Sequence, residues 1–209
     1  MIRIDVRRKA FGETAVLKDV RFEMRPGEAV AILGPSGVGK STLLRVIAGI
    51  DHDFEGQIVR PQDVAMVFQE PVLLPWRRVL ENLTIVHPEL GRDAAMAALR
   101  RVGIADKADL FPGQLSLGQQ RRLALARAFA GRPSLLVMDE PYVSLDPQTS
   151  EEMLELTEAL IAETRPAIIL VTHSEAEAKR LADRTLRLVG QPATIIDSGS
   201  GQPLAGREG

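Results

Sequence analysis

Apolar residues along the chain follow two different periods. Residues 2–6 and 20–24 alternate apolar and polar side chains, which is the period-two pattern of half-buried strands. Continuous apolar runs of strand length occur at residues 29–33, 64–68, 135–138 and 168–171. Uninterrupted runs of this kind are typical of central parallel strands that are covered on both faces.

Helical spacing appears between these strands. The pattern predicts helices at residues 41–48, 151–163 and 174–182. Gly49 is placed to end the first of them, and Ser174 with Glu177 forms a possible capping box at the start of the third. From about residue 80 to 130 the chain is rich in Ala, Leu and Arg and is predicted to be helical.

Strands that alternate with helices indicate an α/β sheet. The first two strands are predicted to form an antiparallel β flap, and the helical middle of the chain an insertion. We expect one domain over residues 1–197, with a helical subdomain inserted at about 71–130. Residues 198–209 are rich in Gly, Ser, Pro and Gln and are expected to form a flexible tail.

Composition excludes several classes of protein. The 209 residues carry 26 Lys and Arg against 28 Asp and Glu, and this near-neutral balance argues against a dedicated nucleic-acid binder. Cysteine is absent, which excludes disulfides and thiolate chemistry. No apolar stretch approaches the roughly 20 residues that cross a bilayer, so we expect a soluble protein that reaches a membrane only through a partner.

Residues 34–41, Gly-Pro-Ser-Gly-Val-Gly-Lys-Ser, match the phosphate-binding loop in full. Glycine is needed because backbone N–H groups must wrap closely around phosphates, where a Cβ would obstruct them. Lys40 is expected to reach the β- and γ-phosphates, and Ser41 to place its hydroxyl on Mg²⁺ at the positive end of a helix. The predicted nucleotide contacts of this segment are Gly34, Pro35, Ser36, Gly37, Gly39, Lys40, Ser41 and Thr42.

Two acids follow the buried strand at 135–138. A carboxylate at a strand end beside a phosphate loop is where Mg²⁺ is held, so Asp139 is the predicted metal anchor. Glu140 is then placed to orient and deprotonate the attacking water.

With these motifs in order, nearly the whole chain resembles the nucleotide-binding subunit of ATP-binding-cassette (ABC) transporters. The resemblance implies a P-loop NTPase of the ABC type, with a mixed sheet core, an antiparallel β flap and an inserted α-helical subdomain. It implies ATP hydrolysis with Mg²⁺ as cofactor. Gln69 resembles the glutamine-loop residue that senses Mg²⁺ and water, and His173 the switch histidine that touches the γ-phosphate. Phe11 stands where the family places an aromatic that stacks on adenine.

Residues 115–119, Leu-Ser-Leu-Gly-Gln, resemble the family signature, which contacts the γ-phosphate held by a second subunit. Ser116, Gly118, Gln119 and, in the loop after the catalytic acid, Asp146 are the expected contacts. Leu117 replaces a glycine of the signature, and Arg121 replaces a downstream glutamine. A leucine can exclude backbone geometry that glycine allows, so a slower site is one expectation.

The Leu-Pro-Trp-Arg stretch that ends at Arg77 is similar to importers of the nitrate, sulfonate and taurine type. Trp76 is equally compatible with an anchor inside the insertion and with a permease contact. The resemblance implies a second ABC subunit in an ATP-bound dimer, transmembrane permease subunits, a solute-binding protein and a place at the inner face of the membrane. Two alternatives stay open: a soluble ABC ATPase that acts on ribosomes or DNA, and a hydrolytically weak regulatory cassette.

Overall fold

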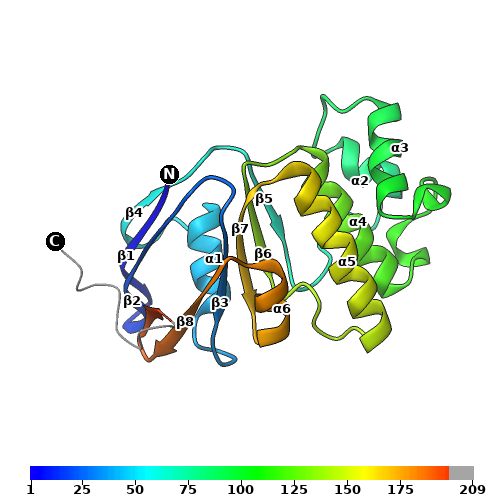
Figure 1. The fold of residues 1–209 in the computed structure, drawn as a ribbon. Coiled ribbons are helices and arrows are strands. Elements are labelled where there is room, and N and C mark those ends of the chain that lie inside the picture. Colours follow the sequence, from blue (N-terminus) through cyan, green and yellow to red (C-terminus); the bar gives the residue numbers. More distant parts are fainter. Residues whose placement is uncertain (198–209) are drawn as a thin grey trace. The chain divides into compact units, whose positions relative to one another are not determined.

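The computed structural model describes residues 1–197 (Figure 1). Contacts between residues divide the chain into two units. Within the described residues, the first contains 1–66, 134–140 and 166–197, and the second contains 67–133 and 141–165. Among the described residues, no helix is both long enough and apolar enough to span a membrane.

The first unit is built on a mixed sheet with the strand order β4-β1-β2-β9-β8-β3-β7-β6-β5. The strands are β1 (Ile2–Phe11), β2 (Thr14–Met24), β3 (Ala29–Leu33), β4 (Glu55–Val59), β5 (Val64–Val67), β6 (Leu135–Asp139), β7 (Ala167–Thr172), β8 (Arg184–Gly190) and β9 (Ala193–Asp197). Strands β8, β3, β7 and β6 run parallel, whereas β4, β1 and β2 pair antiparallel. The predicted antiparallel flap and mixed sheet are therefore confirmed.

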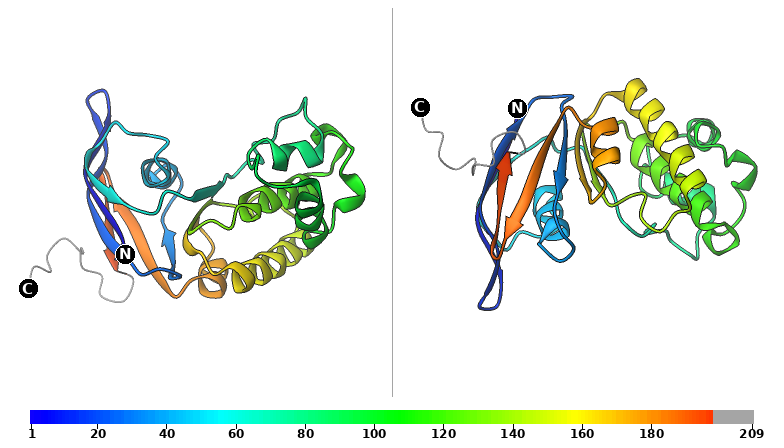
Figure 2. Two further views of the ribbon diagram at one scale, coloured as in Figure 1. Left: turned by 90° about the horizontal axis from the view of Figure 1, so that it is seen from above. Right: turned by 60° about the horizontal axis from the view of Figure 1, so that its bottom comes forward.

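Two helices cover opposite faces of the central strands. Alternate side chains of a strand point to opposite faces, so Val30 and Ile32 of β3 join the large core with helix α1 (Lys40–Ala48). Ala31 and Leu33 pack against Ala178 of helix α6 (Glu175–Leu181). Figure 2 shows α1 and α6 on either side of β3. The core that results holds the carboxyl ends of the parallel strands in fixed positions.

The second unit is helical. It contains α2 (Val79–Thr84), α3 (Arg92–Arg101), α4 (Leu117–Ala130) and α5 (Pro147–Thr164), with short 3₁₀ turns at Ala105–Lys107 and Pro112–Gln114. Helix α4 packs against α2, α3 and α5, and Figure 2 shows α4 and α5 running side by side. Contacts thus group α5 with these helices, although the chain returns to the sheet to form β6 between α4 and α5.

Several elements differ from the sequence-based expectations. β1 and β2 are longer than predicted, and β4, β8 and β9 were not predicted, because their apolar positions are too few or too interrupted to stand out. Helix α5 begins at Pro147, with Asp146 as its N-cap, before the predicted start at residue 151. The expected tail at 198–209 lies outside the described residues.

Candidate functional site

Three parallel strands of the first unit end at the same edge of the sheet. β3 leads into the glycine-rich loop at 34–39, β6 leads into Asp139 and Glu140, and β7 leads into Thr172 and His173. β7 lies between β3 and β6 in the sheet. The carboxyl edge of such a sheet is where α/β proteins bind ligands, and most of the predicted chemistry of this unit gathers there.

The glycines of the loop are required by contacts as well as by conformation. Gly39 has a φ of 111°, and a Cβ on it would lie 3.0 Å from Val16 Cγ1 and 3.1 Å from Leu17 Cδ2. A Cβ on Gly34 would lie 2.7 Å from the carbonyl oxygen of Leu188. Side chains are excluded at both positions, so the loop backbone is held in a form that only glycine permits.

Helix α1 begins directly after this loop. Gly39 is its N-cap and supplies no side-chain hydrogen bond, and the first turn contains no acidic residue. The backbone N–H groups of a helix start need partners, and an anion placed there gains from both the donors and the helix dipole. The start of α1 is therefore suited to a phosphate.

Lys40 is buried and turned back over the loop. Its Nζ donates to the carbonyl oxygens of Gly34 at 2.9 Å and Pro35 at 3.0 Å, and it lies 3.2 Å from Glu140 Oε1. The loop thus holds an ammonium group at its centre and places the carboxylate of Glu140 beside it. Lys40 and Glu140, two of the predicted site residues, are brought into direct contact.

Asp139 lies at the end of β6 and is buried. Burial raises the pKa of its carboxyl group, and a hydrogen bond from the Ser41 hydroxyl opposes that rise. Among residues 1–197, no group hydrogen-bonds to its buried Oδ1. A buried carboxylate oxygen without a protein partner, beside a serine hydroxyl, is the oxygen donor set that Mg²⁺ prefers. The residues present therefore fit the metal that the sequence implies.

Glu140 is held in a strained backbone conformation. Its φ is 44°, which is rare for a residue with a side chain, and its N–H donates to the carbonyl oxygen of Val171 at 2.9 Å. Its Oε2 lies 3.7 Å from His173 Nδ1. Strain of this kind persists where the surroundings fix it and is common at functional sites. Glu140 therefore joins Lys40 on one side and His173 on the other.

Glu177, which the sequence predicts only as part of a capping box, has a further role beside His173. The Thr172 hydroxyl donates to Glu177 Oε2 at 2.5 Å and accepts a hydrogen bond from the Ser174 N–H at 3.0 Å. Ser174 Oγ caps Glu177 N as expected, but the carboxylate of Glu177 goes to Thr172 instead of to Ser174 N. Both neighbours of His173 are therefore fixed. The serine–acid spacing alone does not distinguish these two partners.

Phe11 lies at the tip of the β1–β2 hairpin, and 56% of its surface is exposed. Val16 and Leu17 of the same hairpin are the residues that a Gly39 side chain would meet. The hairpin therefore runs beside the start of α1, and the exposed aromatic belongs to the same unit as the phosphate loop.

The signature residues lie in the second unit. Ser116, Gly118, Gln119 and Asp146 line one hollow of about 420 Å³ between the starts of α4 and α5. Ser116 Oγ accepts from the Gln119 N–H at 3.3 Å, and the Ser116 N–H donates to Gln119 Oε1 at 3.0 Å. The predicted group is thus brought together within this unit, and the side chains of Ser116 and Gln119 each bond to the backbone N–H of the other residue.

The two departures from the signature have different structural settings. Leu117 is the first residue of α4, has ordinary helical backbone, and is 43% exposed. Arg121 is buried, and its guanidinium donates to the carbonyl oxygens of Pro141 and Val143. Arg121 therefore ties α4 to the segment that follows Glu140 in the chain. Its place in the sequence, on a helix rich in arginine, gives no sign of this role.

Gln69 follows β5 and belongs to the second unit. Its predicted contact with the metal site stays a prediction.

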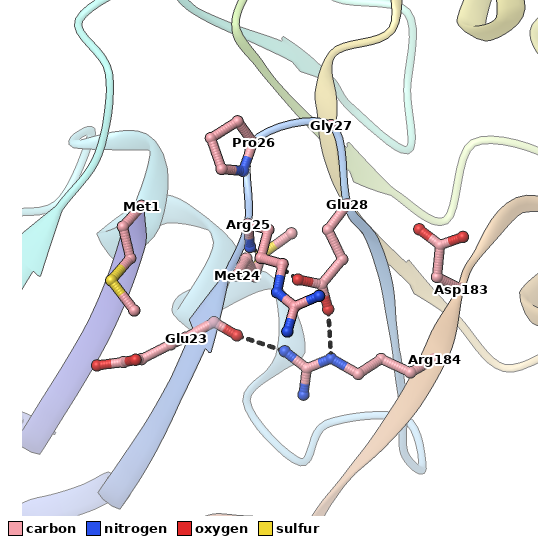
Figure 3. A pocket seen from close by; sticks show the side chains of 9 residues that line it. All are labelled: Met1, Glu23, Met24, Arg25, Pro26, Gly27, Glu28, Asp183 and Arg184. Atoms are coloured by element: carbon pink, nitrogen blue, oxygen red, sulfur yellow. Dashed lines mark hydrogen bonds and ion pairs between the residues drawn. The ribbon is translucent and has the colours of Figure 1, made fainter.

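The first unit has a hollow of its own, of about 770 Å³, at the opposite edge of the sheet. It lies near Glu28 and Arg184 at the starts of β3 and β8 (Figure 3). These two side chains pair with each other at 2.6 Å, and the hollow contains none of the predicted site residues.

Comparison with known proteins decides the family. Residues 17–143 match the family model described as "ABC transporter". This chain belongs to the ABC transporter family. It is the ATP-binding subunit of such a transporter and an ATPase.

Two curated relatives are close over most of the chain. The aliphatic sulfonates import ATP-binding protein SsuB of Mycobacterium sp. (strain MCS) is 47% identical over 187 residues, which cover 87% of this chain and 76% of the relative. A second protein of this name, SsuB 3 of Rhodococcus jostii (strain RHA1), is 45% identical and covers 87% and 68%. The relatives favour a transport ATPase over a cassette that acts on ribosomes or DNA.

A solved structure gives the same fold. The dimeric post-hydrolysis state of the ATP-binding cassette MJ0796, bound to ADP and Pi, has a TM-score of 0.79 and 29% identity. The match covers 94% of this chain and 98% of that one. The ABC type of the fold is therefore confirmed.

Proposed function

We propose that this chain hydrolyses Mg-ATP at the carboxyl edge of its sheet, with Glu140 as the base that activates water. The observation that carries the proposal is the contact of Lys40 Nζ with Glu140 Oε1 at 3.2 Å, directly over a glycine loop at an uncapped helix start. Lys40 and the loop N–H groups bind the β- and γ-phosphates. His173, whose Nδ1 lies 3.7 Å from Glu140, positions the γ-phosphate and the nucleophile.

Ser41 and Asp139 are the proposed metal ligands of the first unit, and Gln69 is the further metal contact that the resemblance to the family implies. The orphaned Oδ1 of Asp139 supports this assignment. When bound, Mg²⁺ supplies a Lewis acid that neutralises charge on the phosphate oxygens. The protein itself orients the nucleotide through its loop and holds the water-activating carboxylate of Glu140 in place.

The ATP site is completed by a second ABC subunit. Ser116, Gly118, Gln119 and Asp146 of that copy would cover the nucleotide bound by the first, so that ATP joins a head-to-tail dimer. The shared hollow of these residues and the dimeric structures of MJ0796 support this arrangement. The helix that starts at residue 117 would point its positive end at the γ-phosphate and stabilise its negative charge, as an arginine finger does in other NTPases.

The substitution Glu140→Gln tests the chemistry. It keeps the size and hydrogen-bonding capacity of the side chain but removes the base, so ATP hydrolysis should fall at least about 100-fold. ATP binding should persist, and size-exclusion chromatography with ATP should show an accumulated dimer. Steady-state hydrolysis at the wild-type rate would reject Glu140 as the base.

The transported solute is proposed from the relatives. Proteins named as aliphatic sulfonate import subunits are 44–47% identical to this chain, so we assign it to an importer of organic anions of that class. It would work at the inner face of the membrane with permease subunits and a solute-binding protein. Transport of radiolabelled alkanesulfonate in a strain that lacks this chain, with and without complementation, tests the assignment.

A loop of the second unit is the proposed permease contact. Trp76 is 69% exposed, which favours a contact with another protein over an anchor inside the helical unit. Asn82 is fully buried and holds the loop: its Nδ2 donates to Leu74, Arg77 and Arg78 carbonyl oxygens, and its Oδ1 accepts from the Leu74 N–H. A fixed loop that presents an exposed tryptophan is suited to protein contact.

Trp76→Ala tests this contact. It should leave ATP binding and the thermal midpoint of the isolated chain unchanged but weaken co-purification with the permease. Val72→Ala, at another exposed apolar residue of the same segment, is the matched control. Unchanged co-purification in Trp76→Ala would remove Trp76 from the interface.

A further inference from the structure

Lys9 is a buried lysine that the nucleotide site does not explain. Its side chain is only 2% exposed, although it lies two residues before the exposed Phe11 on the same strand. A lysine at such a position is costly to bury unless its charge is paired and hydrogen-bonded. Its surroundings therefore indicate what the burial achieves.

An irregularity in the sheet turns Lys9 inward. Along β1 the residues at 2, 4 and 6 are buried, and the same alternation would leave position 9 exposed. The register of β1 with β4 shifts by one residue between Val6 and Arg8, so β1 contains one extra residue there. Such a bulge re-aims the side chains that follow it. Lys9 therefore faces the interior of the unit, beneath the hairpin tip.

The ammonium group of Lys9 is fixed by the loop that follows α1. Its Nζ lies 2.9 Å from Asp51 Oδ2, 2.6 Å from the carbonyl oxygen of Asp53 and 3.3 Å from Asp53 Oδ2. Asp51 is itself held, because its N–H donates to the carbonyl oxygen of Arg45 in the last turn of α1. The helix that starts at the phosphate loop thus fixes this cation at its other end.

The same ammonium group lies against the Phe11 ring, with Nζ 4.7 Å from the ring centroid. A cation at this distance is attracted to the face of an aromatic ring. Phe11 stands at the tip of a two-residue turn, where a side chain with more than half of its surface exposed has few other contacts to restrain it. Lys9 therefore supplies a restraint on one face of the ring, and the exposed surface remains free for another planar group.

We propose that Lys9 is a positioning residue for the base of the nucleotide. Fixed by Asp51 and Asp53, it holds the Phe11 ring so that the ring is already oriented when the base stacks on it. This inference rests on the proposed nucleotide site and extends it, because it assigns a base-positioning role to an ion pair on the far side of the ring. Orientation before binding reduces the entropy that the ligand must offset.

The test compares two probes in the purified full chain by isothermal titration calorimetry. ATP contains the base, whereas inorganic tripolyphosphate contains only the phosphate chain. Lys9→Met with Asp51→Asn removes the cation and its main counter-charge together, and the amide oxygen introduced at position 51 can still accept the Asp53 N–H. This variant should bind ATP about three- to tenfold more weakly and tripolyphosphate as tightly as the wild type.

A purely structural role for Lys9 would produce a different result. The double variant would then weaken the binding of both probes equally, or would weaken ATP binding by the same factor in a chain that already carries Phe11→Ala. Either result, or wild-type ATP affinity in the double variant, overturns the proposal. We expect no further loss of ATP affinity when the double variant is added to Phe11→Ala, and ATP affinity within about twofold of the wild type in Lys9→Arg, which keeps the cation.

Separate variants report on the underlying site. Phe11→Ala should weaken ATP about tenfold, and Lys40→Ala should weaken both probes. Wild-type ATP affinity in Phe11→Ala overturns base stacking and the Lys9 role together. If Phe11→Ala binds ATP weakly but the double variant binds it as tightly as the wild type, only the Lys9 role is overturned. If Lys9→Met with Asp51→Asn does not fold, Lys9→Met with Asp51→Leu replaces the pair by apolar groups, a change that buried ion pairs often tolerate.

Discussion

The phosphate loop of the first unit and the signature hollow of the second both end at helix starts, but they use their backbone N–H groups differently. At α1 the N-cap is Gly39, without a side-chain bond. At α4 the Ser116 hydroxyl caps Gln119 N, and at α5 the Asp146 carboxylate caps Thr149 N. The first region leaves donors for an anion, whereas the second is largely satisfied by its own side chains.

Carboxylates show the same contrast. Burial raises the pKa of Asp139 beside the phosphate loop. Hydrogen bonds from Thr149 lower the pKa of Asp146 in the signature hollow. A buried carboxylate with one oxygen that no protein group satisfies is available to a ligand, whereas a carboxylate that accepts hydrogen bonds at its own helix start is held in a fixed position. We therefore propose that the first region binds nucleotide by itself and that the second acts on a nucleotide that is already bound.

The largest expected effect separates these roles directly. Lys40→Ala should lower the ATP affinity of the dilute chain at least about 100-fold, because it removes the buried cation from the loop. Ser116→Ala should leave that affinity within about twofold but lower hydrolysis at high protein concentration about tenfold. Calorimetry measures the ATP affinity, and ATPase rates over a series of protein concentrations measure the hydrolysis. Loss of ATP binding by the dilute Ser116→Ala chain would contradict the division.

The glycines of the phosphate loop provide a second comparison within one motif. Gly39→Ala introduces a Cβ about 3 Å from Val16 and Leu17 at a φ of 111°, so we expect a loss of about 2–3 kcal/mol in the free energy of unfolding. Gly37, at a φ of 77°, has no atom within 4 Å of its Cβ position. Gly37→Ala should therefore cost only about 1 kcal/mol of backbone strain. Urea unfolding measures both, and equal losses would mean that packing at Gly39 is unimportant.

The two carboxylates should respond to pH with opposite signs. The raised pKa of Asp139 means that the fold disfavours its charged form. The protonated side chain is tolerated at low pH, and folding stability is lost as the pH rises above the ordinary pKa of an aspartate. Asp139→Asn should therefore stabilise the nucleotide-free chain by about 1–2 kcal/mol at pH 7, with the gain shrinking toward pH 4. The lowered pKa of Asp146 means that its charged form stabilises the fold at neutral pH and that this stabilisation is lost on acidification. Asp146→Asn should therefore destabilise the chain at pH 7 and destabilise it less at pH 4. Unfolding curves at both pH values check the signs.

The extent of prediction from sequence follows the same division. The phosphate loop, Asp139 and Glu140 were predicted with their strands because their chemistry needs fixed residue types at fixed spacing. Lys9 was not predicted, because its burial depends on a bulge that follows from pairing with β4, and no local pattern shows that pairing. Arg121 was noted only as a departure from the family pattern, since its two acceptors are backbone carbonyls twenty or more residues away.

The same limit explains the elements that were missed. β4 is mostly exposed, so it lacks the apolar alternation that marks a half-buried strand. It is held by its register with β1, which is a tertiary contact. Asn82 is a similar case: its local sequence does not show that it is buried, and it is fully buried because four backbone groups of its own loop satisfy its side chain.

The smallest expected effects concern the altered signature. Leu117 has ordinary helical backbone and an exposed side chain, so the conformational freedom of the missing glycine is not used at this position. Leu117→Gly should change the ATPase rate less than about twofold and lower the free energy of unfolding by about 0.5–1 kcal/mol through helix propensity.

Gly118 is the matched position. A Cβ there would lie 3.1 Å from Thr149 Cγ2, where the starts of α4 and α5 meet. Gly118→Ala gains helix propensity and loses packing, so its stability should change by less than about 1 kcal/mol, while the reshaped hollow should slow hydrolysis more than Leu117→Gly does. A several-fold faster ATPase in Leu117→Gly would reverse this order. It would mean that the leucine restrains the signature and would favour the hydrolytically weak regulatory cassette over an ordinary transport ATPase.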